Sequence, residues 1–282
     1  MDAPPPPYIL SADLLYWTAR ETGTAFAIKD GRVLHPSFKS HFGFKALLAV
    51  PLPHDGWQLA LQFTHFHARV TETLSGGTFL PTWTHPALGG PTTVSEVFSR
   101  WRLHLGVGDL ILSRCLPISD WLSLTPIVGL RAAGIRFKTR VDYQDDDLSM
   151  KNKYWGVGPR FGFESEAAFT THWAFYGRWA LSTLWGEYYI HQDEELAHGK
   201  LKYLDGYWAA IAIKEMALGL QWEHYFWKSC ASLRLRLGWE MHLFPSQNQW
   251  VQFPSGAMPA KTIGNLGGLS LQGLTLGLLW EF

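Results

Sequence analysis

The fold of this chain is indicated most clearly by one stretch, Cys230-Ala-Ser-Leu-Arg-Leu-Arg-Leu-Gly-Trp-Glu-Met-His-Leu243. Apolar and polar residues alternate along it. Because successive side chains of a β-strand point to opposite sides, the stretch predicts a strand with two different faces. The apolar face holds Ala231, Leu233, Leu235, Leu237, Trp239, Met241 and Leu243, and the polar face holds Ser232, Arg234, Arg236, Gly238, Glu240 and His242.

The same period of two recurs along most of the chain. In the final segment, Gly268–Phe282, Leu274, Leu276, Leu278, Trp280 and Phe282 alternate with Gly273, Thr275, Gly277, Leu279 and Glu281. No window of about 15 residues shows a convincing helical period. About ten strands are predicted, the first at Tyr8–Thr18. In Trp101–Cys115 the alternation slips near Gly108–Asp109, and we interpret the slip as a β-bulge.

The composition excludes several classes of protein. The 282 residues include 24 Lys+Arg and 24 Asp+Glu, 47% are hydrophobic, 17% are charged, and 15 are Trp. A neutral net charge argues against a nucleic-acid-binding protein, and the aromatic content argues against disorder. The mean hydropathy of −0.05 shows that the apolar residues are dispersed, whereas a membrane-spanning helix needs roughly 18 consecutive apolar residues. Dispersed apolar residues with many Trp favour a transmembrane β-barrel.

The connections between the predicted strands alternate in length. Short turns are expected at Pro51–Gly56, Leu116–Asp120, Thr170–His172 and Trp227–Ser229, and long polar loops near Arg20–Ser40, Ser75–Ser99, Tyr143–Lys153, His191–Asp205 and Phe244–Gly267. This alternation is typical of outer-membrane barrels. We therefore expect an all-β, transmembrane, antiparallel up-and-down β-barrel with short periplasmic turns and long external loops. The strand count is ten, or twelve if Ala25–Ile28 pairs with another loop segment. Residues 8–282 form this single domain, and residues 1–7 form a periplasmic N-terminal tail.

Tryptophan residues fall near the ends of the predicted strands. In a membrane barrel they form two aromatic girdles at the membrane interfaces, for which we select Trp57, Trp101, Trp121, Trp155, Trp173, Trp227 and Trp280. The alternative is that these rings fill the core of a soluble β-propeller or sandwich. Loop alternation, Trp at strand ends and a terminal aromatic strand together favour the membrane barrel.

Four stretches also resemble a known family. The first is Ala12-Asp-Leu-Leu-Tyr-Trp17 with Ala19-Arg-Glu21, and the second is Leu52-Pro-His-Asp-Gly-Trp57. The third combines Asp109-Leu110, Trp121-Leu122 and Gly129-Leu-Arg-Ala-Ala133, and the fourth is Tyr154-Trp-Gly-Val-Gly-Pro-Arg160 with Leu184-Trp-Gly186. Their order resembles that of the Legionella-type pore-forming outer-membrane proteins, a family that includes the major-outer-membrane-protein-like porins of environmental chlamydiae. The resemblance implies a porin in a bacterial outer membrane and brings no catalytic residues.

The two chain ends carry further expectations. The N-terminus lacks a signal peptide, which we expect to have been removed from this chain. Trp280 and Phe282 look like the signal that the barrel-assembly machinery reads during biogenesis.

The polar faces of the strands supply the candidate functional residues of the lumen. We select Lys45, Arg131, Arg160, Glu164, Arg178, Glu223, Arg234, Arg236 and Glu240, with Asp13, Gln62, Asp109, Glu215 and Gln221 on the same faces. In a narrow porin these groups line a wet path for ions or small solutes and set its selectivity. Alternatively they pair with one another and plug the barrel, since about eight strands leave an interior that side chains fill. Arg160, Arg178, Arg234 and Arg236 would give a weak anion preference if they converge without enough carboxylates.

The remaining expectations concern catalysis and partners. An enzyme at the external rim, using residues such as His65, His67, Asp142, His191 and Asp193, is a third interpretation. Spacing alone does not assemble these residues into a catalytic set, so we expect no enzyme, no cofactor and no metal site. The expected partners are outer-membrane lipid, the assembly machinery and permeating ions or solutes, with no nucleic acid; a homo-oligomer stays open.

Overall fold

A computed structural model describes residues 8–53, 55–85, 93–144, 146–196, 199–226, 231–253 and 263–282. Among them, no helix is long and apolar enough to cross a membrane. The tail 1–7, Trp227 and Cys230, to which the sequence analysis assigned places, lie outside the described residues.

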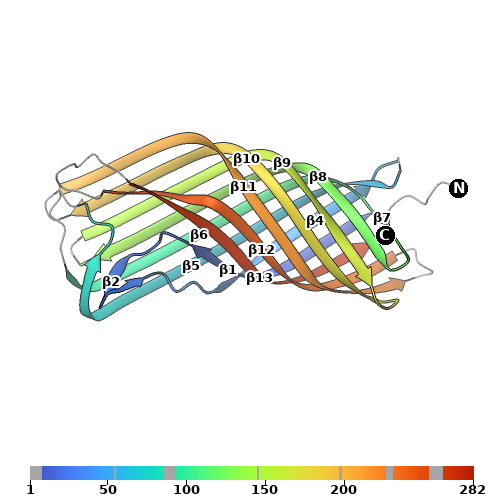
Figure 1. Cartoon of the computed structure of the whole chain (residues 1–282), viewed down its shortest axis with the longest axis horizontal. Coiled ribbons are helices and arrows are strands. Elements are labelled where there is room, and N and C mark those ends of the chain that lie inside the picture. Colours follow the sequence, from blue (N-terminus) through green and yellow to red (C-terminus); the bar gives the residue numbers. More distant parts are fainter. Residues whose placement is uncertain are drawn as a thin grey trace.

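Ten antiparallel strands form a closed barrel (Figure 1). In chain order they are β1 (Ile9–Glu21), β4 (Ser40–Pro51), β5 (Trp57–Pro81), β6 (Val94–Arg114), β8 (Leu122–Tyr143), β9 (Asp146–Ala168), β10 (Trp173–Leu196), β11 (Gly199–Phe226), β12 (Ala231–Gln252) and β13 (Ile263–Glu281). Each barrel strand pairs with the next, and β13 returns to β1, with Ile9 opposite Glu281 and Glu21 opposite Leu269. The fold predicted from the sequence is confirmed.

The barrel closes next to both ends of the described chain. Tyr8 and Phe282 exchange two backbone hydrogen bonds, of 3.0 and 3.1 Å, and their rings stack with centroids 5.9 Å apart. Trp280 lies opposite Leu10 of β1 and Leu233 of β12. The terminal aromatic strand is therefore the one that completes the hydrogen-bonded ring, at the end of the barrel where the short turns lie (Figure 1).

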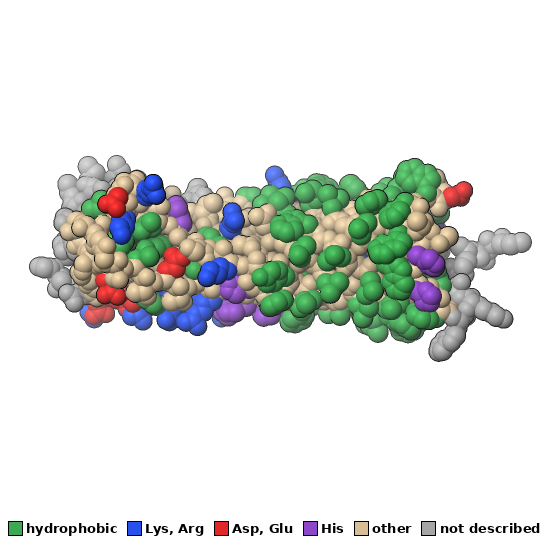
Figure 2. Space-filling view, turned by 90° about the horizontal axis from the view of Figure 1, so that it is seen from below, with side chains coloured by type: hydrophobic (Ala, Val, Ile, Leu, Met, Phe, Trp, Pro, Cys, Tyr) green, Lys and Arg blue, Asp and Glu red, His purple; other side chains and the backbone are tan. Residues whose placement is uncertain are grey.

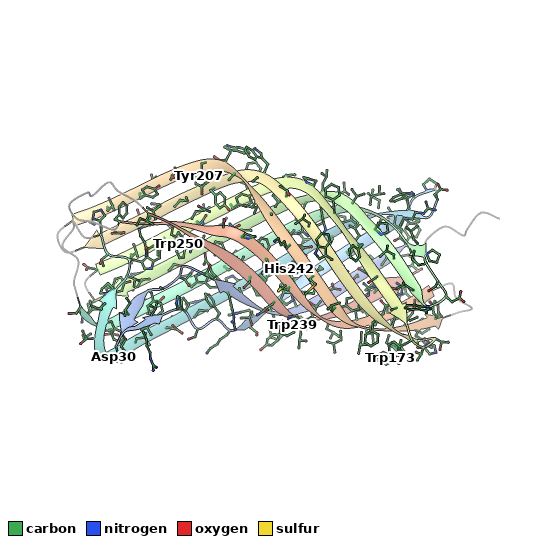
Figure 3. The ribbon with its side chains drawn as sticks, viewed as in Figure 1. Asp30, Trp173, Tyr207, Trp239, His242 and Trp250 are labelled. Atoms are coloured by element: carbon green, nitrogen blue, oxygen red, sulfur yellow. The ribbon has the colours of Figure 1, made fainter. Side chains whose placement is uncertain are left out.

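Three short strands lie outside this ring of ten. β2 (Ala27–Lys29) and β3 (Arg32–Leu34) form a hairpin, and β2 also pairs with the end of β5. Asp30 and Gly31 both have positive φ, 49° and 74°, as a two-residue type I′ turn requires; Figure 3 shows Asp30 at the hairpin tip. β7 (Leu116–Pro117) pairs with the start of β8. The segment around Ala25–Ile28 thus pairs with another part of its loop, without adding a strand to the barrel.

The strands are much longer than a membrane requires. β5 has 25 residues and β11 has 28, whereas about 9–11 residues of a tilted strand cross the hydrocarbon layer. Two stretches expected to be loops, Tyr143–Lys153 and His191–Asp205, lie mostly within β9, β10 and β11. The barrel therefore continues well beyond the membrane at the end opposite the short turns.

The side chains on the outer surface differ between the two halves of the barrel (Figure 2). Around the half with the chain termini, large apolar side chains form a continuous belt, which we call the membrane half. The belt includes Leu14, Phe44, Leu61, Phe63, Leu110, Leu130, Phe161, Phe163, Phe175, Trp179, Leu218, Leu220, Leu237, Trp239, Leu274, Leu276 and Leu278, each at least 40% exposed. On the face shown, most of the charged side chains lie on the other half, which we call the external half.

Strand β6 shows how the two halves differ. Leu110 faces outward in the membrane half, with Asp109 buried inside. Further along the strand the pattern reverses, since Arg102 and His104 face outward while Leu103 is fully buried. Pairing of β6 with β5 and β8 runs through Gly108–Asp109 without a shift. The predicted bulge is therefore wrong: the slip in the sequence marks the point where the medium outside changes from lipid to water.

This change in the direction of the apolar face also shows that one tryptophan was wrongly assigned to the predicted girdle. Trp101 faces the interior and is completely buried, because it belongs to the external half, where apolar side chains point inward. Trp121, Trp155, Trp173 and Trp280 lie on the outer surface, 38–59% exposed, and Trp57 is half-buried at the start of β5. Figure 3 shows Trp173 and Trp239 in the membrane half, and Trp250 in the external half, where it is 1% exposed.

The belt predicts a depth-dependent cost for a charge on the outer wall. Leu276 lies in the middle of the apolar series of β13, so Leu276→Arg should destabilise the protein by about 2–4 kcal/mol in bilayers, as charges do near the midplane. Thr73→Arg, on the exposed outer face of β5 in the external half and opposite Phe98, is the matched control and should change stability little. Urea unfolding in phospholipid vesicles measures both; equal costs would contradict this placement of the membrane.

Candidate functional site

The interior of the membrane half is lined by charged side chains that contact one another across the barrel. The nine lumen residues predicted from the sequence all lie in this network. Among the described residues, the network contains six permanent cations: Lys45, Arg131, Arg160, Arg178, Arg234 and Arg236. It contains eight carboxylates: Asp13, Asp109, Glu164, Glu166, Glu215, Glu223, Glu240 and Glu281.

Arg131 of β8 is the centre of the first part of this network. Its Nε and Nη2 donate to the two carboxylate oxygens of Asp109 at 2.6 and 2.8 Å. Its Nη1 donates to Glu215 of β11, and Glu215 also forms an ion pair with Arg160 of β9. The guanidinium fork thus holds its neighbour Asp109 in a bidentate pair and also reaches β11, across the barrel.

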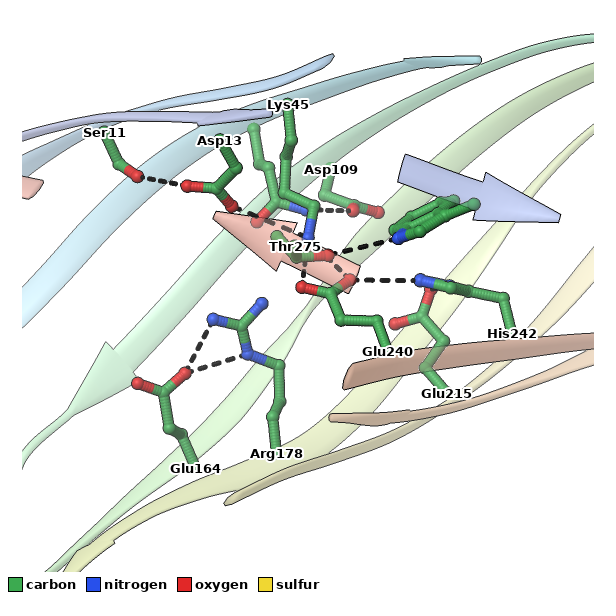
Figure 4. A network of polar contacts seen from close by, with 12 residues as sticks. Ser11, Asp13, Lys45, Asp109, Glu164, Arg178, Glu215, Glu240, His242 and Thr275 are labelled. Carbon is green, nitrogen blue, oxygen red and sulfur yellow. Dashed lines mark hydrogen bonds and ion pairs between the residues drawn. The ribbon is translucent and has the colours of Figure 1, made fainter. Parts of the chain in front are cut away.

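Lys45 of β4 extends the network across the barrel to β12 (Figure 4). Its Nζ donates to both oxygens of Glu240 at 2.9 Å and lies 3.7 Å from Asp13 of β1. His242 lies between the two groups, with Nε2 3.3 Å from Glu240 and Nδ1 3.2 Å from Glu215. Imidazole therefore connects the Lys45 pair to the Arg131 cluster.

A second part of the network lies on β9, β10 and β12. Arg178 donates to Glu164 from Nε and Nη2, each at 2.8 Å. The Nη1 of Arg236 lies 2.8 Å from Glu164, and its Nη2 lies 2.5 Å from Glu166. The guanidinium of Arg236 also packs over the ring of Tyr176, 5.1 Å from its centroid. Glu164 therefore neutralises two arginines at once.

Arg234 holds the part of the network next to the barrel seam. Its Nε donates to Glu223 at 2.7 Å, and its Nη1 lies 3.2 Å from Glu281 of the last strand. Each arginine expected to favour anions thus contacts carboxylates, and the network holds more carboxylates than permanent cations. The condition for an anion preference is not met in this arrangement.

An apolar core fills the interior of the external half, beyond the ion-pair network. The core combines buried aromatic and aliphatic side chains from most of the barrel strands: Leu15, Trp17, Phe66, Trp101, Leu103, Leu105, Ile135, Phe137, Met150, Tyr154, Leu184, Tyr188, Ile213, Phe244, Trp250 and Leu271 are among them. Trp17 lies at the boundary of this core. Its Nε1 donates to the Thr275 hydroxyl at 3.1 Å, and the centroid of its ring lies 5.8 Å from Lys45 Nζ.

The cavities inside the barrel are small. A cavity of about 290 Å³ lies at the end of the barrel that carries the short turns, where Ser113, Cys115 and Ser123 contribute to its wall with Arg234 and Glu281. Spaces of about 50 and 20 Å³ lie within the network. The smaller of them holds little more than one water molecule. Among the described residues, these cavities do not join into a wide aqueous passage.

Three described carboxylic acids are buried in the external half, Glu21, Asp146 and Glu194, and Glu21 lies deepest in the apolar core. Glu21, at the external end of β1, is 2% exposed and accepts a hydrogen bond from Trp101 Nε1, while its Oε1 has no partner among the described residues. Burial raises the pKa of Glu21 to about 8, and the hydrogen bond from Trp101 opposes this increase. Glu21 is therefore protonated at neutral pH and joins the apolar core as a neutral group.

Sequence reasoning missed several members of the interior. Glu166, Glu281 and His242 were visible on polar strand faces but were not selected. Trp17 and Glu21 lie on β1, whose inward face carries both a charged and an apolar part. The signal that could have found them is a change along one inward face, as in β6, where buried Asp109 in the membrane half is followed by buried Leu103 and Trp101 in the external half.

The residues suggested for a rim enzyme lie mostly on the outer wall of the external half. His191 and Asp193, two residues apart on β10, form a pair with Nε2 and Oδ1 2.8 Å apart. His65 and His67 lie on β5, and the carboxylates of Asp142 and Asp147 pair with Arg140. The Cys115 thiol is free and exposed next to a short turn, at the end of the barrel that carries the chain termini.

The Arg131 cluster predicts a large penalty for leaving one partner alone. Arg131→Met should destabilise the protein by about 3–5 kcal/mol, because Asp109 and Glu215 then remain buried with a reduced counter-charge. The exposed pair Lys200–Glu195 provides the control, since Lys200→Met should cost at most about 1 kcal/mol. Urea unfolding in detergent micelles gives both values, and a similar small cost for the two variants would argue against a buried network.

Glu21 predicts that stability depends on pH above the acid range. Its folded pKa lies above the value of about 4.5 expected when unfolded, so its contribution is fully present below pH 4.5 and is lost as the pH rises through about 8. Thermal unfolding between pH 5 and 9 should show this loss, and Glu21→Gln should remove it. The exposed Glu96→Gln should keep the wild-type profile. A profile unaltered by Glu21→Gln would contradict the burial of this acid.

Comparison with known proteins places this architecture in a family. The family model described as the Legionella pneumophila major outer membrane protein precursor matches residues 4–282, and no curated protein matches the sequence.

Solved structures with a similar fold are outer-membrane barrels. The Escherichia coli outer membrane protease OmpT shares 11% identity, covering 100% of this chain and 99% of its own, with a TM-score of 0.53. A Pseudomonas aeruginosa FadL homologue (8% identity, 98% and 90% covered) and the Pseudomonas putida toluene transporter TodX (7%, 98% and 89%) have TM-scores of 0.33 and 0.29. The chain is a bacterial outer-membrane β-barrel and belongs to the Legionella pneumophila major outer membrane protein family.

Proposed function

We propose that this protein is a closed outer-membrane barrel that acts as a structural component of the envelope and presents its external half to the surroundings. The observation that carries this proposal is the filling of the interior by two different materials. Ion pairs occupy the membrane half and an apolar core occupies the external half.

The ion-pair network supports closure because its charges are already neutralised. Arg131 and Arg160 are 2–3% exposed, and Lys45 is 4% exposed, so the water needed to solvate a permeating ion is largely absent around them. An ion entering this region would have to separate buried pairs, and breaking such a pair is strongly unfavourable. The network therefore resembles a plug more than a selectivity filter.

The apolar core supports closure independently. Trp101, Phe137 and Leu103 are completely buried, and an ion cannot cross a packed apolar region without its hydration shell. A solute would have to pass both this core and the ion pairs. Closure does not depend on either barrier alone.

A narrow porin is the second candidate, and the periplasmic cavity favours it. The 290 Å³ space is lined by Arg160, Glu164, Arg178, Arg234 and Arg236, among others, and so provides a wet, charged entrance. If the apolar core rearranges, this entrance leads directly to the network. Water or small ions would then pass along the paired charges.

The proposal includes no catalytic activity. Among the described residues, His191 bonds to Asp193 and to no serine, threonine or cysteine, so the geometry does not support a covalent route through one of those three nucleophiles. Incubation of the purified barrel with peptide and lipid-ester substrates should yield no turnover. Turnover that is lost in His191→Ala would favour the rim-enzyme interpretation.

Conductance separates the two main candidates. The refolded protein in a planar bilayer should give no long-lived conductance steps, because both halves of its interior are filled. A wide porin of about 16 strands, which encloses an aqueous channel, is the positive control for insertion. Stable steps whose ion selectivity changes in Arg160→Gln would overturn the closed-barrel proposal and support the narrow porin.

A further inference from the structure

A basic groove lies on the outer wall of the barrel, immediately beyond the apolar belt. It encloses about 940 Å³ and is bounded by outward-facing side chains of β5, β6, β8, β9 and β10, including His65, His104, Arg136, Lys153, Trp155 and Tyr189. Figure 2 shows blue and purple side chains gathered along the lower edge of the molecule, next to the border of the green belt.

The register of the strands aligns these basic residues in two adjacent rows. In the first row Arg69 lies opposite Arg102, Arg102 opposite Lys138, and Lys138 opposite Lys151, which is followed by His191. The second row, one step nearer the belt, contains His67, His104, Arg136 and Lys153, followed by Tyr189. Basic side chains thus oppose one another across four consecutive strand pairs in the first row.

Such rows cost stability unless an anion compensates them. Like charges directly opposite in a sheet are destabilising. Among the described residues, Arg69, Arg102, Arg136, Lys138, Lys151 and Lys153 form no ion pair with a carboxylate within 4.0 Å, unlike the interior arginines. One carboxylate, Asp205, also lines the groove, but it accepts hydrogen bonds from the Tyr203 hydroxyl at 3.0 Å and from the Gly206 amide at 2.8 Å.

The hollow itself is created by two glycines. Gly106 and Gly134 lie opposite each other on β6 and β8, between the basic rows and the belt. A Cβ atom added to either would meet nothing within 4 Å. Ordinary side chains would fit there sterically, and their absence leaves room beneath the cationic groups.

Tryptophans place the groove at the level of lipid headgroups. Trp155 and Trp185 both pack against Trp208, with centroids 5.6 and 6.2 Å apart, and all three rings are about half exposed. Trp is enriched where hydrocarbon meets water, and this cluster lies at the belt side of the groove. An occupant would contact cationic groups at one end and the apolar belt at the other.

From this arrangement we propose that the groove binds a phosphorylated lipid of the outer leaflet. Phosphate oxygens accept hydrogen bonds from Arg136, Lys151 and Lys153, which line the groove, and so offset their mutual repulsion, while acyl chains continue down the apolar wall. Basic pockets of membrane proteins recognise phosphorylated headgroups in this way. The inference does not require the interior to be closed, so it stands whether or not the barrel conducts.

Native mass spectrometry of the barrel in neutral detergent tests this binding with lipid A, a diphosphorylated acylated disaccharide, as the probe. Bound lipid A should be retained, and the triple variant Arg136→Gln/Lys151→Gln/Lys153→Gln should bind it at least ten-fold more weakly. The control Arg20→Gln/Arg32→Gln/Lys200→Gln removes the same charge from exposed positions outside the groove and should bind like the wild type.

A second variant tests the groove without changing its charge. Gly106→Leu/Gly134→Leu fills the hollow, which is open at both positions, and should weaken lipid A binding at least five-fold while circular dichroism stays that of a folded barrel. Equal binding by all variants would overturn the proposal. Competition by inorganic phosphate at the same concentration as lipid A would also overturn it, by identifying a site for soluble anions, and so would equal binding of phosphatidylcholine.

Discussion

The medium outside the barrel changes from hydrocarbon to water part-way along each strand, and most of the structure follows from this constraint. A strand offers its side chains only two directions, in or out. In the membrane half the outward direction must be apolar, which leaves the inward direction for Lys45, Arg131 and the other charges. In the external half the outward direction is wet, so Leu103, Phe137 and Tyr188 turn inward and pack. The interior therefore contains two layers, an ion-pair network and an apolar core, stacked along the barrel axis.

These two layers satisfy different physical requirements. Charges that cannot face lipid are stable inside only when they are paired, and the bidentate contact between Arg131 and Asp109 meets that requirement. Apolar groups in the external half need no partner but must pack densely, which the rings of Trp17, Phe66, Trp101 and Phe137 do. Glu21 lies in the apolar layer, and its raised pKa reflects this position. The boundary between the layers is spanned by Trp17, which contacts both.

Much of the fold was predictable from the sequence, because a period of two with one apolar face has few structural solutions. The alternation of Ala231–Leu243, the short turns and the terminal Phe282 led to ten strands and to the membrane-facing side. The interpretation failed where it assumed that an apolar face always meets lipid. Trp101 was assigned to a girdle and Gly108–Asp109 to a bulge for that single reason. The polar outer faces of β9, β10 and β11 were read as loops, since water-exposed strands lack an apolar outer face. Cross-strand neighbours, such as Arg102 beside Lys138, depend on register, which a single sequence does not specify.

Side chains keep the same inward and outward positions along each strand, but the apolar face changes from outward to inward at one level of the barrel, and the interior is closed on both sides of that level. A nitroxide scan along β6 in bilayers, comparing collisions with oxygen and with a water-soluble nickel chelate, measures this most directly. Labels at Leu110 and Leu112 should collide with oxygen, labels at Arg102 and His104 with the chelate, and labels at Leu103, Leu105 and Val107 with neither. Chelate collisions at Leu103, Leu105 and Val107 comparable to those at Arg102 would show a water-filled lumen and would contradict the account.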